Sequence, residues 1–176
     1  TLSPIVDLQG LGRPRERQFN VTAGLAGVSG SIAMPIGRRT GIRLGMNKEA
    51  LEDGDALIKL DPKSPNGYAI RGKALTALNQ PAEALTDFNS ALERNPGDDN
   101  LLYDRGALLF NSFSRYTDAL KDFDQAIQKN PKGLYFMTRS FCHFKLNDKE
   151  KAKDDARMAI QKGATIPQNY LALLGL

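Results

Sequence analysis

The chain has 176 residues, of which 41% are hydrophobic, and this length suits one domain with an appendage. Its single cysteine, Cys142, excludes an internal disulfide framework. The net charge of +4 lies entirely in residues 1–46, which hold six arginines, one aspartate and one glutamate, whereas residues 47–176 hold 18 basic and 18 acidic residues.

Residues 1–46 form a leader whose composition differs from that of the rest of the chain. It contains eight of the 16 glycines and no lysine. Residues 18–37 carry no charge, and a run of that length could span a membrane as a helix, but its glycines and polar side chains argue against this. The arginines around this run fall in two clusters: Arg13, Arg15 and Arg17, then Arg38, Arg39 and Arg43.

Hydrophobic alternation in the leader favours short β-strands. Apolar residues alternate with small or polar ones in residues 19–25, 28–34 and 42–46, which predicts two or three strands. A sheet of this size is marginal in water by itself. We therefore expect the leader to pack on the rest of the chain, to pair with a partner's sheet edge, or to extend over another subunit.

The leader also resembles an organellar targeting segment, because it is rich in arginine and poor in acidic residues. The chain begins at Thr1 rather than at a methionine, which is typical of a processed product. The sequence does not determine the compartment. A processed organellar protein, or a bacterial exported or envelope-associated protein, is favoured over a cytosolic one.

Residues 47–64 are predicted to hold one helix, with an asparagine at its start and a proline just beyond its end. Ala50 and Leu57 lie one period before Ala84 and Ala91, which belong to the repeated units described next. This spacing indicates the second helix of a degenerate unit. We expect it to cap the N-terminal end of the helical stack.

One pattern occurs three times between residues 65 and 164. Arg71, Arg105 and Arg139 recur at a constant spacing, and each is followed by a similar alanine-containing closing segment. A fixed period of about 34 residues indicates stacked supersecondary units, none of which can bury its apolar face alone. The predicted units are residues 65–98, 99–132 and 133–164, and residues 165–176 are predicted to form a C-terminal capping helix.

Several positions recur together within these units. The eighth position of each unit is small, positions 20 and 27 are small, and position 24 is aromatic in the first two units. These residues are Gly72, Gly106 and Ser140, then Ala84, Ala119 and Ala152, then Ala91, Ala126 and Ala159, and the aromatic Phe88 and Phe123. A proline closes the first two units.

This pattern resembles the tetratricopeptide repeat family over roughly residues 65–164. The resemblance implies a mainly α fold, a right-handed superhelix of antiparallel helix pairs, here preceded by an extended or small β-strand leader. The sequence departs from the family pattern in two places. The middle unit has one extra residue near residues 112–114, and the third unit lacks both the aromatic residue and the proline, as a terminal repeat does.

Each repeated arginine is followed by an aspartate at the same spacing, which the insertion in the middle unit lengthens by one. We interpret the three pairs as structural ion pairs between the two helices of a unit, since paired Arg and Asp tolerate partial burial. A ladder of ligand-binding arginines is the alternative. The pairs are Arg71 with Asp87, Arg105 with Asp122, and Arg139 with Asp155.

The sequence offers no catalytic constellation. The lone His143 is adjacent to Cys142, and neighbouring residues on a helix point about 100° apart, which argues against a nucleophile and base. No phosphate-binding loop occurs, and no His or Cys joins the carboxylates as metal ligands. We therefore predict no enzyme activity, no catalytic residues, no cofactor, no metal site and no small-molecule substrate.

The resemblance also implies a binding groove, lined by positions 2, 5, 9, 12 and 13 of the first helices. The residues at these places become apolar and aromatic towards the third unit, and the alternative is that the leader or neighbouring helices cover part of this stripe. The predicted groove residues are Lys73, Tyr103, Ala107, Phe110, Asn111, Leu134, Met137 and Phe141. A groove for a chaperone's C-terminal carboxylate is excluded, because Asp104 would repel that group.

The functional prediction is a non-catalytic protein–protein interaction module, a scaffold or assembly subunit whose partners are other protein subunits. The groove would bind an apolar peptide, and the leader would dock the chain into a larger complex. The first alternative is an RNA- or ribosome-associated subunit with the leader arginines on phosphates, although nucleic acid is the less favoured partner. The second is a membrane-associated assembly factor.

Overall fold

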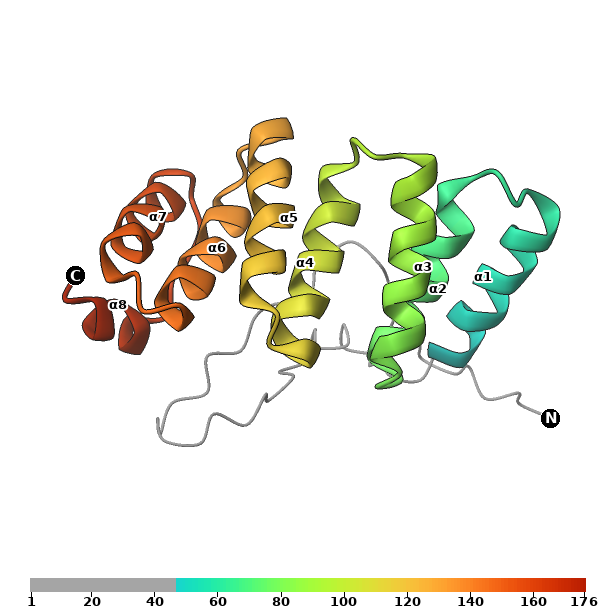
Figure 1. The fold of residues 1–176 in the computed structure, drawn as a ribbon, viewed down its shortest axis with the longest axis horizontal. Coiled ribbons are helices and arrows are strands. Elements are labelled where there is room, and N and C mark those ends of the chain that lie inside the picture. The colour runs from blue at the N-terminus through green and yellow to red at the C-terminus, as the bar shows by residue number, and fades with distance from the viewer. Residues whose placement is uncertain (1–46) are drawn as a thin grey trace, which may run out of the picture.

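The computed structural model describes residues 47–176, and their regular secondary structure is entirely helical (Figure 1). The predicted strands and the six leader arginines fall in residues 1–46 and lie outside the described residues. The helices are α1 (Asn47–Leu60), α2 (Pro65–Ala77), α3 (Pro81–Arg94), α4 (Asp99–Phe113), α5 (Tyr116–Lys129), α6 (Gly133–Lys145), α7 (Lys149–Gln161) and α8 (Gln168–Leu174).

The helix starts follow from local chemistry. Ser64 caps α2 by accepting a hydrogen bond from the backbone N–H of Asn66, and Asp98 caps α4 by accepting from two such groups. A side-chain oxygen at this position satisfies N–H groups that have no partner within the helix. Proline opens α2 and α3, where its fixed φ suits the first turn and its missing N–H costs nothing.

The turn inside each unit contains one residue with positive φ. These residues are Asn79 at 60°, Ser114 at 53° and Asn147 at 63°. Asparagine tolerates this left-handed conformation better than most residues with a side chain. The extra residue of the middle unit lies at the end of α4, next to Ser114. Helix α4 has 15 residues, whereas α2 and α6 have 13.

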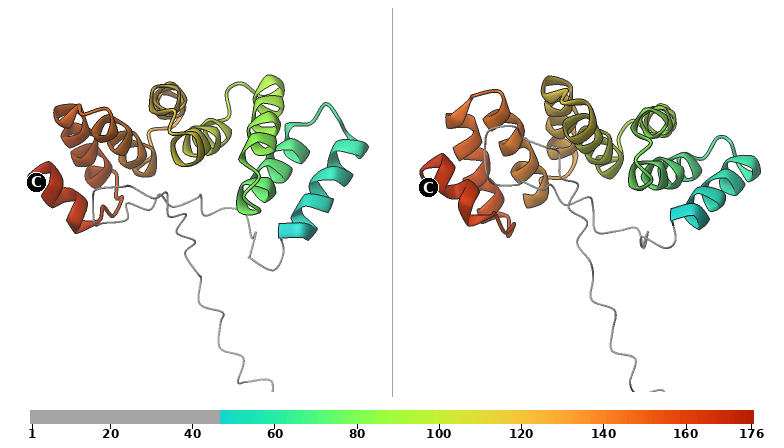
Figure 2. Two further views of the ribbon diagram at one scale, coloured as in Figure 1. Left: turned by 60° about the horizontal axis from the view of Figure 1, so that its bottom comes forward. Right: turned by 90° about the horizontal axis from the view of Figure 1, so that it is seen from below.

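The helices form a curved row in which α2, α4 and α6 lie on the inner side and α3, α5 and α7 on the outer side (Figure 2). Close approach within a pair depends on the small residue at position eight. A Cβ atom on Gly72 would lie 3.1 Å from the ring of Phe88, and one on Gly106 would lie 2.8 Å from the ring of Phe123. Both rings are buried, so they fill the space between helices and stabilise the stack.

Helix α1 packs against α2 through two glycines. A Cβ atom on Gly54 would lie 2.7 Å from Cβ of Arg71, and one on Gly67 would lie 2.8 Å from the side chain of Ile58. Any larger side chain at either place would force the two helices apart. The glycines therefore set the distance between α1 and the first complete pair.

The C-terminal helix α8 covers the end of the stack. Tyr170 is fully buried, and its ring lies edge-on to Phe141 at a centroid distance of 4.5 Å and to Phe144 at 5.5 Å. Its hydroxyl lies 2.8 Å from Oγ of Ser140, which donates a hydrogen bond to the backbone oxygen of Ala152. Among residues 47–176, no helix combines the length and the apolar character needed to cross a bilayer.

Candidate functional site

The concave surface of the stack is formed by residues on the inner sides of α2, α4 and α6 (Figure 2). On α6, four apolar residues recur at intervals of three or four: Leu134, Met137, Phe141 and Phe144. This spacing places them along one face of the helix. We refer to these four residues as the α6 stripe.

The predicted groove residues differ in their exposure. Five of them are between 2% and 7% exposed: Tyr103, Ala107, Phe110, Met137 and Phe141. Lys73, Asn111 and Leu134 are half-buried. Side chains that are already buried offer a partner little new apolar area, so the five form the floor of the concave surface rather than exposed anchors.

Aromatic neighbours account for part of this burial. The ring of Tyr103 stacks on Tyr135 at a centroid distance of 5.0 Å, and Phe110 lies 5.1 Å from Tyr116. Phe141 is covered by Tyr170 of α8. The accessible apolar residues of the α6 stripe are therefore the half-buried Leu134 and Phe144.

One buried ion pair joins α2 to α4 on this surface. The ammonium group of Lys73 lies 2.8 Å from a carboxylate oxygen of Asp104, which is buried. Burial raises the pKa of Asp104 above its usual value, and the charge of Lys73 opposes that rise. Because Lys73 is engaged with Asp104, it offers no free cation for a peptide carboxylate.

A second polar cluster joins the starts of α4 and α6. The ammonium group of Lys132 contacts Asp99, Asn100 and the hydroxyl of Tyr135, and this hydroxyl donates to Asp99 over 2.7 Å. Burial disfavours the charged form of Asp99, but the hydrogen bonds from Lys132 and Tyr135 outweigh burial and hold its pKa below the usual value. The cluster fixes the ring of Tyr135 beneath Tyr103.

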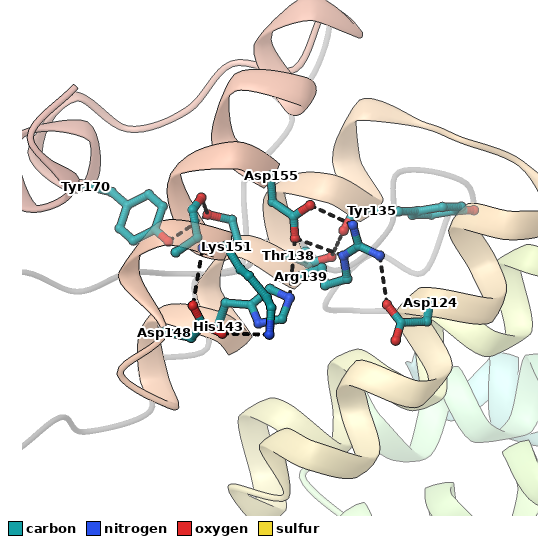
Figure 3. A network of polar contacts seen from close by, with 11 residues as sticks. Asp124, Tyr135, Thr138, Arg139, His143, Asp148, Lys151, Asp155 and Tyr170 are labelled. Carbon is teal, nitrogen blue, oxygen red and sulfur yellow. Dashed lines mark hydrogen bonds and ion pairs between the residues drawn. The ribbon is translucent and has the colours of Figure 1, made fainter.

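The three repeated arginines are fully engaged. Arg71 binds both carboxylate oxygens of Asp87 at 2.8 Å, and its remaining terminal nitrogen lies 2.7 Å from Asp55 of the preceding helix. Arg105 binds Asp122 and Asn89 in the same way. Figure 3 shows the third case, Arg139 between Asp155 and Asp124.

We refer to each arginine with its two acceptors as an inter-unit clamp. One acceptor lies in the second helix of its own unit and the other in the second helix of the preceding unit. The bidentate contact raises the pKa of Arg71 and Arg139 above the usual value, chiefly through the hydrogen bonds with Asp87 and Asp155. The clamps leave no guanidinium free to form a ladder for a ligand.

The sequence matches the family model of the tetratricopeptide repeat over residues 71–133. This segment of the chain contains tetratricopeptide repeats. The matched segment begins at the first clamp arginine and ends at the start of α6, so it contains the middle unit and most of the first. No match was found among curated proteins.

Solved tetratricopeptide repeat structures share this fold. TTC0263 of Thermus thermophilus superposes with a TM-score of 0.64 at 20% identity, over 76% of this chain and 75% of that one. A structure of MamA gives 0.63 at 18% identity, over 68% and 70% of the two chains. YrrB, described as a TPR protein with an unusual peptide-binding site, gives 0.62 at 24% identity, over 74% and 66%.

The tetratricopeptide repeat arrangement also explains which clamp residues the sequence pattern did not reveal. Asp55, Asn89 and Asp124 occupy position 25 of successive units, α1 included. The position alternates between acid and amide, so it does not stand out in a comparison of the units. The only feature of these residues that could have predicted the contact is that all three side chains carry an oxygen that accepts hydrogen bonds.

Cys142 and His143 lie in the interior of the last repeat. Burial raises the pKa of the Cys142 thiol, which keeps it protonated and unreactive near neutral pH. Nε2 of His143 lies 3.8 Å from Asp155, yet burial lowers the pKa of the imidazole (Figure 3). In the part of the chain that the structure describes, no three His, Cys, Asp or Glu residues are grouped to hold a metal ion.

Proposed function

We propose that this tetratricopeptide repeat protein is a non-catalytic scaffold or assembly subunit that binds an apolar peptide on the concave surface of α4 and α6. The observation that carries this proposal is the α6 stripe, which places Leu134 and Phe144 above a buried apolar floor. Repeat proteins of this class use such inner surfaces to bind other proteins.

The two half-buried stripe residues supply the apolar contact. Full burial of one such side chain contributes about 1.5–3 kcal/mol before the cost of ordering the peptide. Asn111 lies half-buried on α4 and carries an amide that donates and accepts hydrogen bonds with a peptide backbone. YrrB supports a peptide as the ligand class, because that protein has a similar fold and a peptide-binding site.

The test is a peptide-display selection on the full chain, followed by affinity measurement with the selected peptides. Leu134→Glu should weaken binding by at least about tenfold, the loss expected when a charge replaces a buried apolar contact. Leu146→Glu is the matched control, because Leu146 is 40% exposed and lies just beyond the end of α6. Equal affinity in Leu134→Glu and the wild type, with unchanged thermal stability, would contradict the proposal.

The leader arginines support a separate docking role, in which residues 1–46 attach the chain to a larger complex. Six arginines without a lysine also suit phosphate groups, so an RNA-associated subunit is the second candidate. RNA binding that falls steeply with salt would favour that candidate. Binding to protein alone, unaffected by ribonuclease, would favour the scaffold.

A further inference from the structure

Helix α1 exposes a face that every complete unit covers. Ala50, Asp53 and Leu57 lie one repeat period before Ala84, Asp87 and Ala91 of α3. Those three residues of α3 are between 0% and 3% exposed, because the first helix of their own unit lies on them. On α1, Leu57 is 36% exposed, and Leu60, one turn further, is 83% exposed.

The aspartate at this position binds an arginine in each complete unit. Asp87, Asp122 and Asp155 each receive two hydrogen bonds from the arginine of their own first helix. Asp53 occupies the same position and is exposed, and within residues 47–176 no cation lies within ion-pair distance of it. Glu49 and Glu52 are exposed close to Asp53 in the sequence, and α1 carries four acidic residues against the exposed Lys48 and Lys59.

The other end of the stack is closed. Arg157 stands at position 25 of the third unit, where the preceding units have Asp55, Asn89 and Asp124. Leu173 of α8 stands one repeat period after Arg139, in the place of a clamp arginine. A basic residue opposite a leucine cannot form a further clamp at the C-terminal end. The α1 end, in contrast, keeps an aspartate that could accept hydrogen bonds from an arginine.

The chain's own leader has the wrong sequence for the missing helix. Counting back by the repeat period, that helix would span residues 31–43, where Pro35, Gly37 and Gly41 disfavour a helix. The clamp position itself holds Gly37 instead of arginine.

We propose that the exposed face of α1 is a docking site for a basic helix of a partner protein, which places an arginine on Asp53 and apolar side chains on Leu57 and Leu60. The surface is distinct from the concave surface. The three internal units show the geometry that the partner would reproduce: a bidentate arginine followed by a small residue, where the helices come closest. The acidic surroundings of Asp53 favour a partner helix with net positive charge.

The probe is a helix-stabilised peptide with the sequence of residues 65–79, which contains the arginine and glycine of the first unit. Its affinity for the full chain is measured by fluorescence anisotropy. Asp53→Lys in the chain, or the Arg71→Glu replacement in the peptide, should each weaken binding by at least about tenfold, because each places like charges together. Combining the two changes should restore most of the affinity.

Glu93→Lys is the matched control, because Glu93 is an exposed acid on the second helix of the next unit. It should leave the affinity within about twofold of the wild type, as expected for a charge outside the interface. Absence of peptide binding, or equal effects of Asp53→Lys and Glu93→Lys, would overturn the proposal. Binding that appears only after Arg38, Arg39 and Arg43 are replaced by alanine would also overturn it, because the leader would then be the occupant.

Discussion

Arg105 donates a hydrogen bond to the side-chain oxygen of Asn89 over 2.9 Å, where the other two inter-unit clamps have an arginine–aspartate pair at 2.7 Å. The joint between the first and second units therefore lacks one negative charge that both neighbouring joints possess. The same three guanidinium nitrogens donate in all three clamps, so the middle joint differs in the charge of one acceptor.

Asn89→Asp should complete the middle clamp and stabilise the protein. Because residue 89 is exposed, we expect a gain of about 0.2–1 kcal/mol in the free energy of unfolding, and a smaller gain at high salt. Urea denaturation at low and high ionic strength measures this. Asn89→Ala controls for the loss of the amide, and a destabilised Asn89→Asp variant would show that the clamp does not tolerate a third charge.

Lys73→Met should destabilise the protein, because it leaves the buried carboxylate of Asp104 without its cation. Loss of one partner of a buried pair costs up to about 3–5 kcal/mol, and the partial exposure of Lys73 places this case below that range. Adding Asp104→Asn should recover part of the loss, since the amide carries no charge. Chemical denaturation of the single and double variants provides the comparison.

The same pair predicts a pH dependence. Burial raises the folded-state pKa of Asp104 above that of the unfolded chain, so the folded state binds more protons between the two values. The stability deficit of Lys73→Met should therefore shrink as the pH falls through that window, because Asp104 becomes neutral. A deficit that stays constant from neutral pH to about pH 4 would show that lost packing of the lysine stem causes it.

Gly106→Ala should be destabilising, and Gly97→Ala should not. A Cβ atom on Gly106 would meet the ring of Phe123 at 2.8 Å, whereas one on Gly97 would meet nothing closer than 3.9 Å. Overpacking a core costs about 1–3 kcal/mol, while glycine to alanine at an unstrained site gains about 0.4–1 kcal/mol. Thermal unfolding of both variants tests whether position eight of the repeat must be small.

His143 should make the protein less stable below neutral pH. Burial lowers the folded-state pKa of the imidazole, so the unfolded chain takes up a proton near about pH 6.5 before the folded protein does. Stability should therefore decrease as the pH falls through about 6.5 towards the folded-state pKa. His143 is the only histidine, so His143→Gln should flatten this part of the curve. If the pH dependence of stability is unchanged in His143→Gln, the carboxylates cause the loss of stability.

The repeat fold could be predicted because the same requirements recur at a fixed period. Position eight must be small wherever two helices meet closely, because a Cβ atom on Gly72 or Gly106 would lie 3.1 Å or 2.8 Å from a phenylalanine ring of the paired helix. The tetratricopeptide repeat prediction and the superhelical fold are confirmed by the family match and by the solved structures. Non-catalytic peptide binding stays a proposal, and so do the roles of the leader.

The candidate surface was harder to predict, because its character depends on residues that occur only once. Tyr135 and Tyr170 reach across from neighbouring helices and contact Tyr103 and Phe141. The sequence pattern identified the inner positions of α4 and α6 but carried no information on which of these side chains would be covered. The predicted groove residues consequently include five side chains that form the floor.

The repeat pattern alone predicts the helix pairs, the unit length and the spacing that brings each clamp arginine to the aspartate of its own unit. These features repeat, and a feature that repeats can be recognised in the sequence. The packed helices were needed to identify the second acceptor of each clamp, the exposure of the concave surface and the exposed face of α1. Such contacts join different units or the two ends of the stack, where the period stops, so their residues are set by packing rather than by recurrence.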